Sequence, residues 1–337
     1  MSGPPSPCAV LGAGSWGTAL SMRLARNGFT VRLWDRDTRL MEEIAARGEN
    51  PRYLPGLPLP DGIVPSPHMG EAVSGAALVV IAVPTVGFRG VLDRLAESAP
   101  PAGTRVLWAT KGIETETGRW LHEVYAERFA QGPPGGVLSG PSFAGEVARG
   151  LPTAVTVAAA DLQLAAELAA WFHAETFRTY LSDDVIGVEL GGAVKNVLAI
   201  GAGIADGLGF GANARAALIT RGLHEIVRLG DVLGARRETL MGLAGLGDLV
   251  LTCTDDQSRN RRFGLALGQG VEAARAARDI GQAIEGRETA RVLMRVIEQA
   301  GGVEMPIARQ VYRILYEGLD PRDAVTELLA RSLKTED

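Results

Sequence analysis

Short runs of apolar residues alternate with stretches of helical periodicity over the first half of the chain. Several of these runs are continuous rather than alternating, which is typical of strands buried on both faces of a mainly parallel sheet. Helical stretches such as Trp16–Asn27 and Arg89–Ala96 separate many of them. This alternation predicts right-handed βαβ units in a doubly wound sheet. The predicted strands are Cys8–Leu11, Thr30–Trp34, Leu78–Val83, Arg105–Ala109, Gly136–Ser139 and Ala154–Ala158.

The apolar pattern changes near residue 183, after which strand signals end and helical periodicity continues. We therefore predict a boundary near Ser182, with an α/β domain over residues 1–182 and an all-α domain over residues 183–337. Within the first domain, the Pro- and Gly-rich stretch Pro51–Pro67 is predicted to be a loop that either closes over a ligand or crosses the surface. The predicted helices of the second domain are Val185–Ala205, Ala214–Leu233, Arg262–Leu267, Thr289–Gln299, Pro306–Glu317 and Pro321–Ala330.

One lysine, Lys195, lies inside the apolar, glycine-rich segment Val185–Phe210, which is predicted to be a buried helix that runs into a glycine loop. Lysine is almost never fully buried without a partner, and each glycine in a helix interior costs about 1 kcal/mol relative to alanine. Proton transfer or anion binding would explain the lysine, and close approach of a backbone or a ligand would explain the glycines. Alternatively, the lysine extends to the surface from an ordinary packed helix. The glycines of the helical part are Gly187, Gly191, Gly192, Gly201 and Gly203.

The composition argues against several classes of protein. A net charge of −5 makes a general nucleic-acid surface improbable. Two cysteines and four histidines are too few for a disulfide framework or a Cys/His zinc site. Met1–Pro7 lacks the basic region and apolar core of a signal peptide, and no uncharged apolar run reaches about 18 residues. We therefore expect a cytoplasmic protein that binds no metal and no nucleic acid and does not span a membrane.

The segment Gly12-Ala13-Gly14-Ser15-Trp16-Gly17 follows a predicted strand and opens a predicted helix, which is the context of a dinucleotide-binding fingerprint. Gly12 permits the tight turn, and Gly14 lets the backbone approach a pyrophosphate. Gly17 completes the motif at the usual spacing. The start of the helix adds free N–H donors and a positive dipole end. The motif therefore predicts a Rossmann-type domain that binds a dinucleotide, against the alternative of a glycine-rich turn without a ligand.

The second predicted strand ends in Trp34-Asp35-Arg36, 18 residues after Gly17. A carboxylate at the position of Asp35 would accept hydrogen bonds from the adenosine ribose and would repel a 2′-phosphate, which favours NAD. The guanidinium of Arg36 could pair with a 2′-phosphate, which favours NADP. The pattern leaves both cofactors, NAD(H) and NADP(H), open.

Four polar clusters could carry the chemistry of a hydride transfer to a ketone, whose oxygen gains negative charge in the reaction. A lysine such as Lys195 would stabilise that charge and donate a proton, and Asp248 could orient the lysine or bind a substrate hydroxyl. Ser258 is predicted to cap a helix whose free N–H groups, together with Arg259, could hold a phosphate. The clusters are Thr110-Lys111-Gly112 at a predicted strand end, Lys195-Asn196, Gly245–Leu249 with Thr252, and Ser258-Arg259-Asn260-Arg261-Arg262.

Each of these clusters also has a purely structural interpretation. Lys111 alone would be a solvated loop lysine, and Asp248 alone would most often be a helix cap. The cluster at Ser258 would be a solvated cap with exposed arginines. Cys253 carries no sign of reactivity and is interpreted as a small buried residue.

Five separated motifs, in this order and over nearly the whole chain, resemble those of NAD(P)-dependent glycerol-3-phosphate dehydrogenases of the bacterial biosynthetic type. The resemblance covers residues from about Cys8 to Ala330. The motifs are Gly14–Ala19, Ser139-Gly140-Pro141-Ser142-Phe143-Ala144, Gly192–Asn196 through Asn213, Gly245–Leu249 and Ser258–Gly264.

The resemblance implies an oxidoreductase that interconverts dihydroxyacetone phosphate and sn-glycerol 3-phosphate for glycerophospholipid synthesis, usually as a homodimer. It implies that Lys195 is the proton donor and acceptor, and that Gly140 and Ser142 belong to an active-site loop. The substrate-binding residues expected from the resemblance and from the polar clusters are Lys111, Gly140, Ser142, Asn196, Asp248, Thr252, Ser258, Arg259 and Asn260. The expected cofactor-binding residues are Gly12, Gly14, Ser15, Trp16, Gly17, Asp35, Arg36, Lys111, Ala144, Arg259 and Glu285.

Two other functions are compatible with parts of the pattern. A dehydrogenase acting on a β-hydroxyacid or sugar acid would use Lys195-Asn196 equally well, but the cluster at Ser258 suits a phosphate better than a carboxylate. A catalytically silent dinucleotide sensor would need the fingerprint without Lys195, Asp248 and Arg259 together.

Overall fold

The computed structural model describes residues 7–330, so the predicted absence of a signal peptide in Met1–Pro7 falls almost wholly outside the described residues. The described residues up to Glu114, together with Arg119–Glu189, form one compact unit. Thr115–Gly118 and the residues from Leu190 onward form the second. The passage from one unit to the other falls inside a helix, and the boundary at residue 182 stays a prediction.

The first unit is built on an eight-stranded sheet with the order β10-β9-β8-β7-β6-β1-β2-β5. Neighbouring strands pair in parallel except β8 and β9, which are antiparallel, so the predicted mainly parallel α/β sheet is confirmed. The central strands are fully buried, which explains their continuous apolar sequences. The strands are β1 (Cys8–Leu11), β2 (Val31–Trp34), β5 (Ile63–Ser66), β6 (Leu78–Ile81), β7 (Arg105–Trp108), β8 (Gly135–Ser139), β9 (Thr153–Ala159) and β10 (Phe177–Ser182).

The predicted loop Pro51–Pro67 is wrong in part, because it contains two strands. One is β4 (Leu54–Pro58), which pairs antiparallel with β3 (Glu49–Asn50), and the other is β5, the strand at one end of the large sheet. A proline in a strand removes an N–H donor, and an end strand tolerates this because one of its edges has no partner. The strand β10 at the other end was missed as well, because only part of its sequence is buried.

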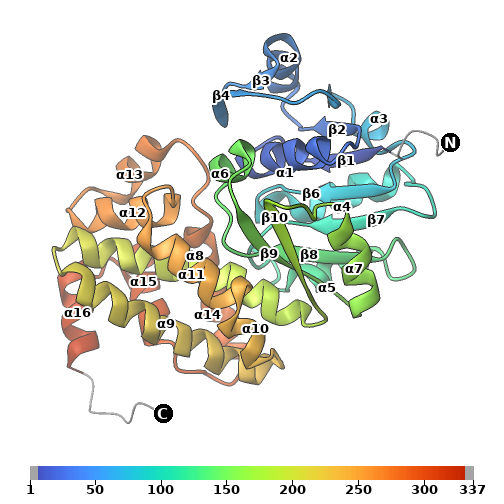
Figure 1. The fold of residues 1–337 in the computed structure, drawn as a ribbon. Helices are drawn as coiled ribbons and strands as arrows, with labels where there is room; N and C mark the ends of the chain where they lie inside the picture. Colours follow the sequence, from blue (N-terminus) through green and yellow to red (C-terminus); the bar gives the residue numbers. More distant parts are fainter. Residues whose placement is uncertain (1–6, 331–337) are drawn as a thin grey trace. The chain divides into compact units, whose positions relative to one another are not determined.

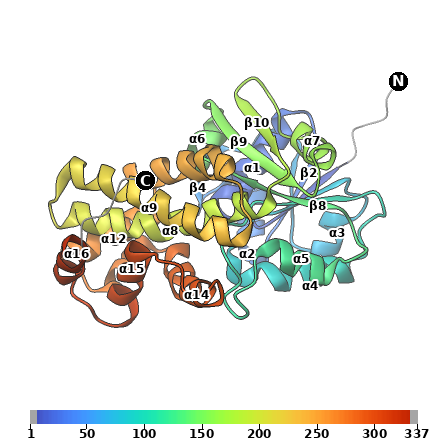
Figure 2. The ribbon, with the colours of Figure 1, turned by 90° about the horizontal axis from the view of Figure 1, so that it is seen from below.

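Helices cover both faces of the sheet in the first unit. The core on one face is formed with α1 (Ser15–Arg26), α2 (Thr38–Arg47), α6 (Ala144–Arg149) and α7 (Leu162–Ala170). Figure 2 shows α4 (Phe88–Glu97) and α5 (Leu121–Arg128) on the opposite side of the sheet from α7. A short helix, α3 (Met69–Val73), and a 3₁₀ turn, η1 (Thr85–Gly87), complete the helical segments described in this unit.

The described part of the second unit is helical, which confirms the predicted all-α region (Figure 1). Helix α8 (Val185–Gly207) begins in the first unit and continues as a core helix of the second. It is long and apolar enough to cross a membrane, but 89% of its apolar window is buried inside the protein. The other segments are α9 (Gly211–Leu233), α10 (Arg237–Met241), the π turn η2 (Leu243–Gly247), α11 (Asp248–Thr254), α12 (Arg259–Gly268), α13 (Ala273–Ile280), α14 (Glu285–Gln299), α15 (Pro306–Tyr316) and α16 (Pro321–Leu329).

The glycines of α8 allow another helix backbone to lie directly against it. A Cβ atom on Gly203 would lie 2.1 Å from the carbonyl oxygen of Arg261 in α12. The contact is reciprocal, since a Cβ on Gly264 of α12 would lie 2.0 Å from the carbonyl oxygen of Ile200 in α8. One turn further on, Gly207 and Gly268 repeat the same arrangement. Close approach of a backbone, one of the two explanations considered for the glycines of α8, is therefore the correct one for Gly203.

Candidate active site

The fingerprint loop between β1 and α1 has the shape that a bound pyrophosphate requires. Gly12 has φ +116°, a conformation that strains any residue with a side chain, and its Cβ would lie 2.6 Å from the carbonyl oxygen of Ala82. A Cβ on Gly17 would lie 1.8 Å from the carbonyl oxygen of Gly12, so α1 packs directly on the loop. At Gly14, by contrast, a Cβ would meet no atom within 4 Å.

The first turn of α1 has the free donors that the phosphates of a dinucleotide need. Its N-cap residue is Gly14, which has no side chain to bond the amides of the first turn. The open space at Gly14 and the helix start together form a cradle for an anion. The fingerprint residues therefore fit the dinucleotide that the sequence predicts, and Ser15 and Trp16 begin the helix at this cradle.

Two residues that sequence reasoning missed hold the loop in place. The side-chain amide of Asn50 donates to the carbonyl oxygen of Ala13 and to Oγ1 of Thr18, each at 2.8 Å. Oγ of Ser15 donates to the carbonyl oxygen of Tyr53 at 3.1 Å. These contacts come from the β3–β4 hairpin, which lies within and beside the stretch that was predicted to be a loop. No motif in the sequence marks them, because the pairing of an asparagine with a distant backbone leaves no local pattern.

The carboxylate of Asp35 accepts hydrogen bonds from two backbone N–H groups of the protein. Oδ2 accepts from the backbone N–H of Ala13 at 2.8 Å, and Oδ1 accepts from the N–H of Asp37 at 3.1 Å. Asp35 therefore ties the end of β2 to the fingerprint loop, in addition to the predicted role at the ribose. Arg36 follows it and is exposed.

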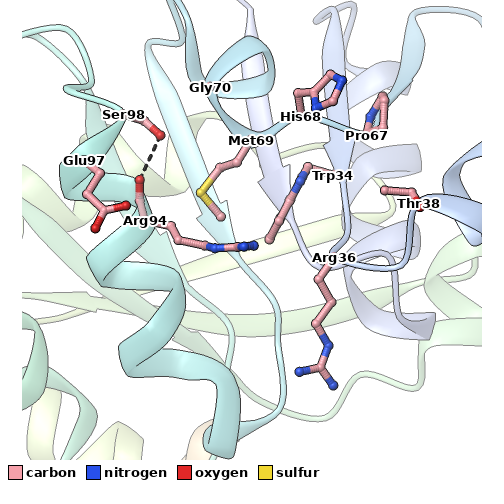
Figure 3. A pocket seen from close by; sticks show the side chains of 10 residues that line it. All are labelled: Trp34, Arg36, Thr38, Pro67, His68, Met69, Gly70, Arg94, Glu97 and Ser98. Carbon is pink, nitrogen blue, oxygen red and sulfur yellow. Dashed lines mark hydrogen bonds between the residues drawn. The ribbon is translucent and has the colours of Figure 1, made fainter.

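A cavity of about 440 Å³ lies beside Arg36 at the end of β2 (Figure 3). The guanidinium of Arg94 lies 5.8 Å from the centre of the Trp34 ring, at a distance suited to a cation–π contact. Figure 3 shows the side chain of Arg36 pointing away from this indole. Among the described residues neither Arg36 nor Arg94 forms an ion pair. Two arginines and one carboxylate, Glu97, thus line the cavity, and the arginines offer the cations that the recognition of a phosphate requires.

A second cluster in the first unit lies where β7 and β8 end. Nζ of Lys111 donates to the carbonyl oxygen of Gly140 at 3.1 Å, and Oγ of Ser142 donates to the same oxygen at 2.9 Å. Because β7 and β8 are parallel neighbours, the segments after them meet at the carboxyl edge of the sheet, where ligands bind in open α/β sheets. Ala144 begins α6 directly after this loop. Lys111 is thus held by a backbone carbonyl and is not a freely solvated loop residue.

In the second unit, Lys195 is buried and has specific partners. Its Nζ donates to Oδ1 of Asp248 at 2.5 Å and to Oγ1 of Thr252 at 2.9 Å. Lys195 is 7% exposed and Asp248 is 1% exposed. The alternative that this lysine simply extends into solvent is therefore wrong. A buried ion pair of this kind costs about 3–5 kcal/mol when one partner is removed, because the other charge stays buried.

The elements that carry these three side chains fix their spacing. Lys195 lies in the middle of α8, and Asp248 and Thr252 lie one turn apart at the start of α11. Oγ1 of Thr252 also donates to the backbone carbonyl of Asp248 at 2.6 Å. Asp248 begins its helix but does not cap it, since Gly247 occupies the N-cap position. The carboxylate of Asp248 thus contacts Lys195, and its two predicted roles, orienting the lysine and binding a substrate hydroxyl, both stay predictions.

Two asparagines form a buried chain of hydrogen bonds beside this cluster. The amide of Asn260 donates to Oδ1 of Asn196 at 2.9 Å, and its own Oδ1 accepts from the N–H of Gly286 at 2.9 Å. The structure thus brings α8, α12 and the start of α14 together. Glu285, the first residue of α14, is placed at this junction by its neighbour Gly286.

The start of α12 is built as predicted around Ser258. Oγ of Ser258 accepts from the N–H of Arg261 at 3.2 Å, which confirms the predicted cap. Arg259 is the first residue of the helix, is half-buried and has one long contact, 3.4 Å from NH1 to Oε1 of Gln282. The first-turn amides and this guanidinium provide positive charge for an anion.

Arg261 is a structural residue that the sequence reasoning left without a role. It is 8% exposed and donates to Asp206 at 2.7 Å and to the carbonyl oxygen of Cys253 at 3.2 Å. It also pairs with Asp256, and Asp206 receives a second arginine, Arg215. These bonds tie the end of α8 and the end of α11 to the start of α12. Burial raises the pKa of the Cys253 thiol to about 12, which confirms the interpretation of an unreactive residue.

The fold and the two clusters define a dehydrogenase-like protein, in which a Rossmann-type unit is followed by a helical unit with a buried lysine. Matches of the sequence to models of protein families identify the family within this class. Residues 7–165 match the N-terminal model of NAD-dependent glycerol-3-phosphate dehydrogenase, and residues 184–326 match the C-terminal model. The chain belongs to the NAD-dependent glycerol-3-phosphate dehydrogenase family.

Individual relatives agree with this assignment over the full chain. A glycerol-3-phosphate dehydrogenase [NAD(P)+] of Thioalkalivibrio sulfidiphilus is 58% identical and aligns over 100% of both chains. The crystal structure of glycerol-3-phosphate dehydrogenase from Coxiella burnetii is 51% identical, covers 97% of this chain and 99% of its own, and superposes with a TM-score of 0.93. A D-mandelate dehydrogenase structure is 18% identical, covers 93% of this chain and 98% of its own, and has a TM-score of 0.61, a likeness of fold alone. This chain thus shares only its fold with the hydroxyacid dehydrogenase. With the glycerol-3-phosphate dehydrogenases it shares its sequence as well.

Proposed function

We propose that this chain interconverts dihydroxyacetone phosphate and sn-glycerol 3-phosphate with Lys195 as the proton donor and acceptor. Membership of the family makes the chain an NAD(P)-dependent glycerol-3-phosphate dehydrogenase, an oxidoreductase. The nicotinamide cofactor, NAD(H) or NADP(H), supplies or accepts the hydride when it is bound. The observation that carries the proposal is the buried contact between Lys195 and Asp248, at 2.5 Å.

Lys195 has the charge and the setting that a proton donor to a ketone oxygen needs. Asp248 stabilises the ammonium form, and Thr252 accepts from a second N–H. A lysine ammonium donates through N–H groups of the kind that a ketone oxygen accepts from. As negative charge develops on that oxygen, the lysine stabilises it and then transfers the proton. In the reverse direction the amine accepts the proton from the substrate hydroxyl.

Recognition of the phosphate is proposed for the start of α12. Arg259 and the amides of the first turn supply a charge-assisted site for a dianion, and Ser258 fixes the geometry of that turn. Asn196 and Asn260 keep α8 and α12 in register beside it. Lys111, Gly140 and Ser142 keep the substrate-binding role that the family resemblance gives them.

Two further expectations go with this function. In the first unit, Gly12, Gly14 and Gly17 shape the cradle for the pyrophosphate, and Arg36 offers a cation to a 2′-phosphate. The chain is expected to work in the cytoplasm as a homodimer and to supply glycerol phosphate for phospholipid synthesis, as the family resemblance implies. Gel filtration with light scattering tests the dimer directly.

The experiment that tests the proposal follows the oxidation of NADH and NADPH with dihydroxyacetone phosphate in the wild type and in Lys195→Ala. We expect kcat to fall about 10²–10⁴-fold, which is the usual contribution of a general acid. Cofactor affinity, measured separately by fluorescence titration, should stay within about twofold if the lysine acts only on the proton. Lys195→Met, which keeps most of the aliphatic stem, should be equally impaired. A variant that turns over at the wild-type rate would remove Lys195 from the chemistry.

A further inference from the structure

Two backbones meet one helical turn before the Lys195–Asp248 pair. Gly191 precedes Lys195 by four residues on α8, and a Cβ on Gly191 would lie 2.4 Å from the carbonyl oxygen of Ala244. The same Cβ would lie 3.0 Å from Cα of Gly245. Side chains can rotate away from such a contact, but backbone atoms cannot. The absence of a side chain at residue 191 is therefore what allows this approach.

The backbone that Gly191 contacts is the π turn Leu243–Gly247, which leads directly into Asp248. The N–H of Gly247 donates to the carbonyl oxygen of Gly242 at 3.0 Å, as the five-residue spacing of a π turn requires. A Cβ on Gly245 would lie 1.9 Å from the carbonyl oxygen of Leu240, so the turn also depends on a glycine within itself. The position of Asp248 is thus determined by the seating of this turn on α8.

We propose that Gly191 is a positioning residue for catalysis, which sets the distance between Lys195 and Asp248 by seating the π turn against α8. This inference rests on the proposed proton-transfer role of Lys195. Both contacts lie between α8 and the continuous segment formed by η2 and α11, four residues apart on each side, so a shift at one is transmitted to the other. A wider separation at Gly191 lengthens the contact between Nζ and Oδ1, which is 2.5 Å.

The inference predicts a specific kinetic effect for Gly191→Ala. The added methyl group has to displace the backbone of the π turn, and Asp248 moves with it. A displacement of about 1 Å in a catalytic group can cost on the order of 10²-fold in rate, so we expect a fall in kcat of that order. The KM for dihydroxyacetone phosphate should change little, because α12 is not part of this contact. Weaker pairing disfavours the ammonium, so the basic limb of the pH–rate profile should move to lower pH.

A matched control lies on the same helix. In Gly201→Ala the new Cβ would meet only side-chain atoms, with Cγ2 of Val311 the nearest at 3.2 Å. Both variants add one methyl group to α8 and gain the same helix propensity. Gly201→Ala should keep the wild-type kcat and pH profile. If Gly191→Ala keeps them as well, the positioning role is wrong.

A double variant separates positioning from general damage. In Gly191→Ala combined with Asp248→Glu, the longer acidic side chain spans the widened gap, so kcat should recover relative to Gly191→Ala alone. The single change Asp248→Glu should lower kcat, because it overfills a contact that is already short. Additive losses in the double variant would overturn the inference.

A second pair of variants tests the inference without adding an atom, in case Gly191→Ala does not fold. Leu240→Ala removes the buried side chain of the residue whose backbone lies against Gly245 of the π turn, and Leu198→Ala removes a buried side chain elsewhere on α8, against Gly222. Leu240→Ala should shift the pH profile and lower kcat, whereas Leu198→Ala should lower only thermal stability. Equal pH profiles in the two variants would overturn the inference.

Failure of the inference can be told apart from failure of the proposed function. If Lys195→Ala is inactive and Gly191→Ala behaves like Gly201→Ala, only the positioning role is wrong. If Lys195→Ala is fully active, the proposed chemistry itself is wrong, and a loss of rate in Gly191→Ala would then have another cause.

Discussion

The fingerprint loop of the first unit and the lysine cluster of the second depend on glycine for different reasons. Gly12 needs both a positive φ and the absence of a side chain, because the chain turns sharply there. Gly191 and Gly203 lie inside α8 and need only the absence of a side chain, because other backbones press on them. The loop thus depends on the backbone conformation of its glycine, and the cluster depends on the close approach of neighbouring backbones.

The two regions also differ in what they present to a ligand. At the loop the donors are backbone amides, and side chains such as Asp35 and Asn50 serve to hold that backbone. In the second unit the functional groups are side chains, and the backbone contacts serve to hold them. Substitutions at the fingerprint loop should therefore act on cofactor binding, and substitutions in the lysine cluster on the rate.

The comparison is tested most strongly at Arg259. In Arg259→Ala we expect the KM for dihydroxyacetone phosphate to rise about 10- to 150-fold, since a charge-assisted hydrogen bond contributes about 1.5–3 kcal/mol. The neighbouring exposed Arg262→Ala is the matched control and should change KM little. Unphosphorylated dihydroxyacetone should be affected equally little by both changes. An equal loss with this substrate would show that Arg259 does not bind the phosphate.

Gly14→Ala tests whether the cradle of the first unit is reserved for a ligand. The new Cβ meets no protein atom within 4 Å, so the melting temperature should not change. A methyl group in the path of the pyrophosphate should weaken cofactor binding about tenfold or more, as overpacking costs about 1–3 kcal/mol. Gly90→Ala, which also meets no atom within 4 Å, is the control. Unchanged cofactor affinity in Gly14→Ala would place the pyrophosphate elsewhere.

Asp35→Ala sharpens the comparison, because the structure shows Asp35 holding the loop and the sequence predicts a second role for it at the ribose. Loss of its bonds to the N–H groups of Ala13 and Asp37 should loosen the loop and weaken NADH and NADPH binding alike, by about 0.5–1.5 kcal/mol per bond. Loss of its negative charge should also shift the ratio of kcat/KM toward NADPH. A shift in the ratio without a common loss of affinity would mean that Asp35 acts at the ribose alone.

The smallest effect is expected for a pair that serves neither site directly, His122 and Glu189. Burial lowers the pKa of His122, but its hydrogen bond to Glu189 at 2.7 Å and the charge of that carboxylate outweigh burial and raise the pKa above 6.5. A histidine whose pKa is higher in the folded state stabilises that state. The contribution is complete below the pKa of the unfolded state, about 6.5, and is lost as the pH rises through the pKa of the folded state. The wild type should therefore exceed His122→Gln in melting temperature at about pH 6 and lose that advantage at about pH 9. A difference that grows with pH would contradict the assignment.

Much of the fold followed from local patterns. Continuous apolar runs predicted the buried central strands, and the glycine spacing with its flanking elements predicted the fingerprint. The end strands β5 and β10 escaped prediction because Pro65 and the exposed Arg178 and Tyr180 weaken the apolar signal. A strand at a sheet edge needs fewer apolar residues, so its sequence differs little from that of a loop.

The candidate site was predicted in its parts and not in its assembly. Lys195 was identified because a charged residue in an apolar helix needs a partner or a function. Ser258 was identified as a residue type that caps helices. Its partner Asp248 lies 53 residues along the chain, and no local pattern encodes that pairing. The π turn, Asn50 and the bonds of Arg261 could not be predicted for the same reason. They depend on which distant backbones come together.

The reciprocal glycine contact between α8 and α12 limits how this protein can be redesigned. With Gly203 and Gly207 against Gly264 and Gly268, neither helix can slide or rotate on the other without steric conflict. Exchanging side chains at the start of α12 is therefore one way to change substrate preference that leaves the packing of the two helices intact. A library that varies Arg259 and its neighbours while preserving these four glycines would test other anionic substrates with the position of α12 unchanged.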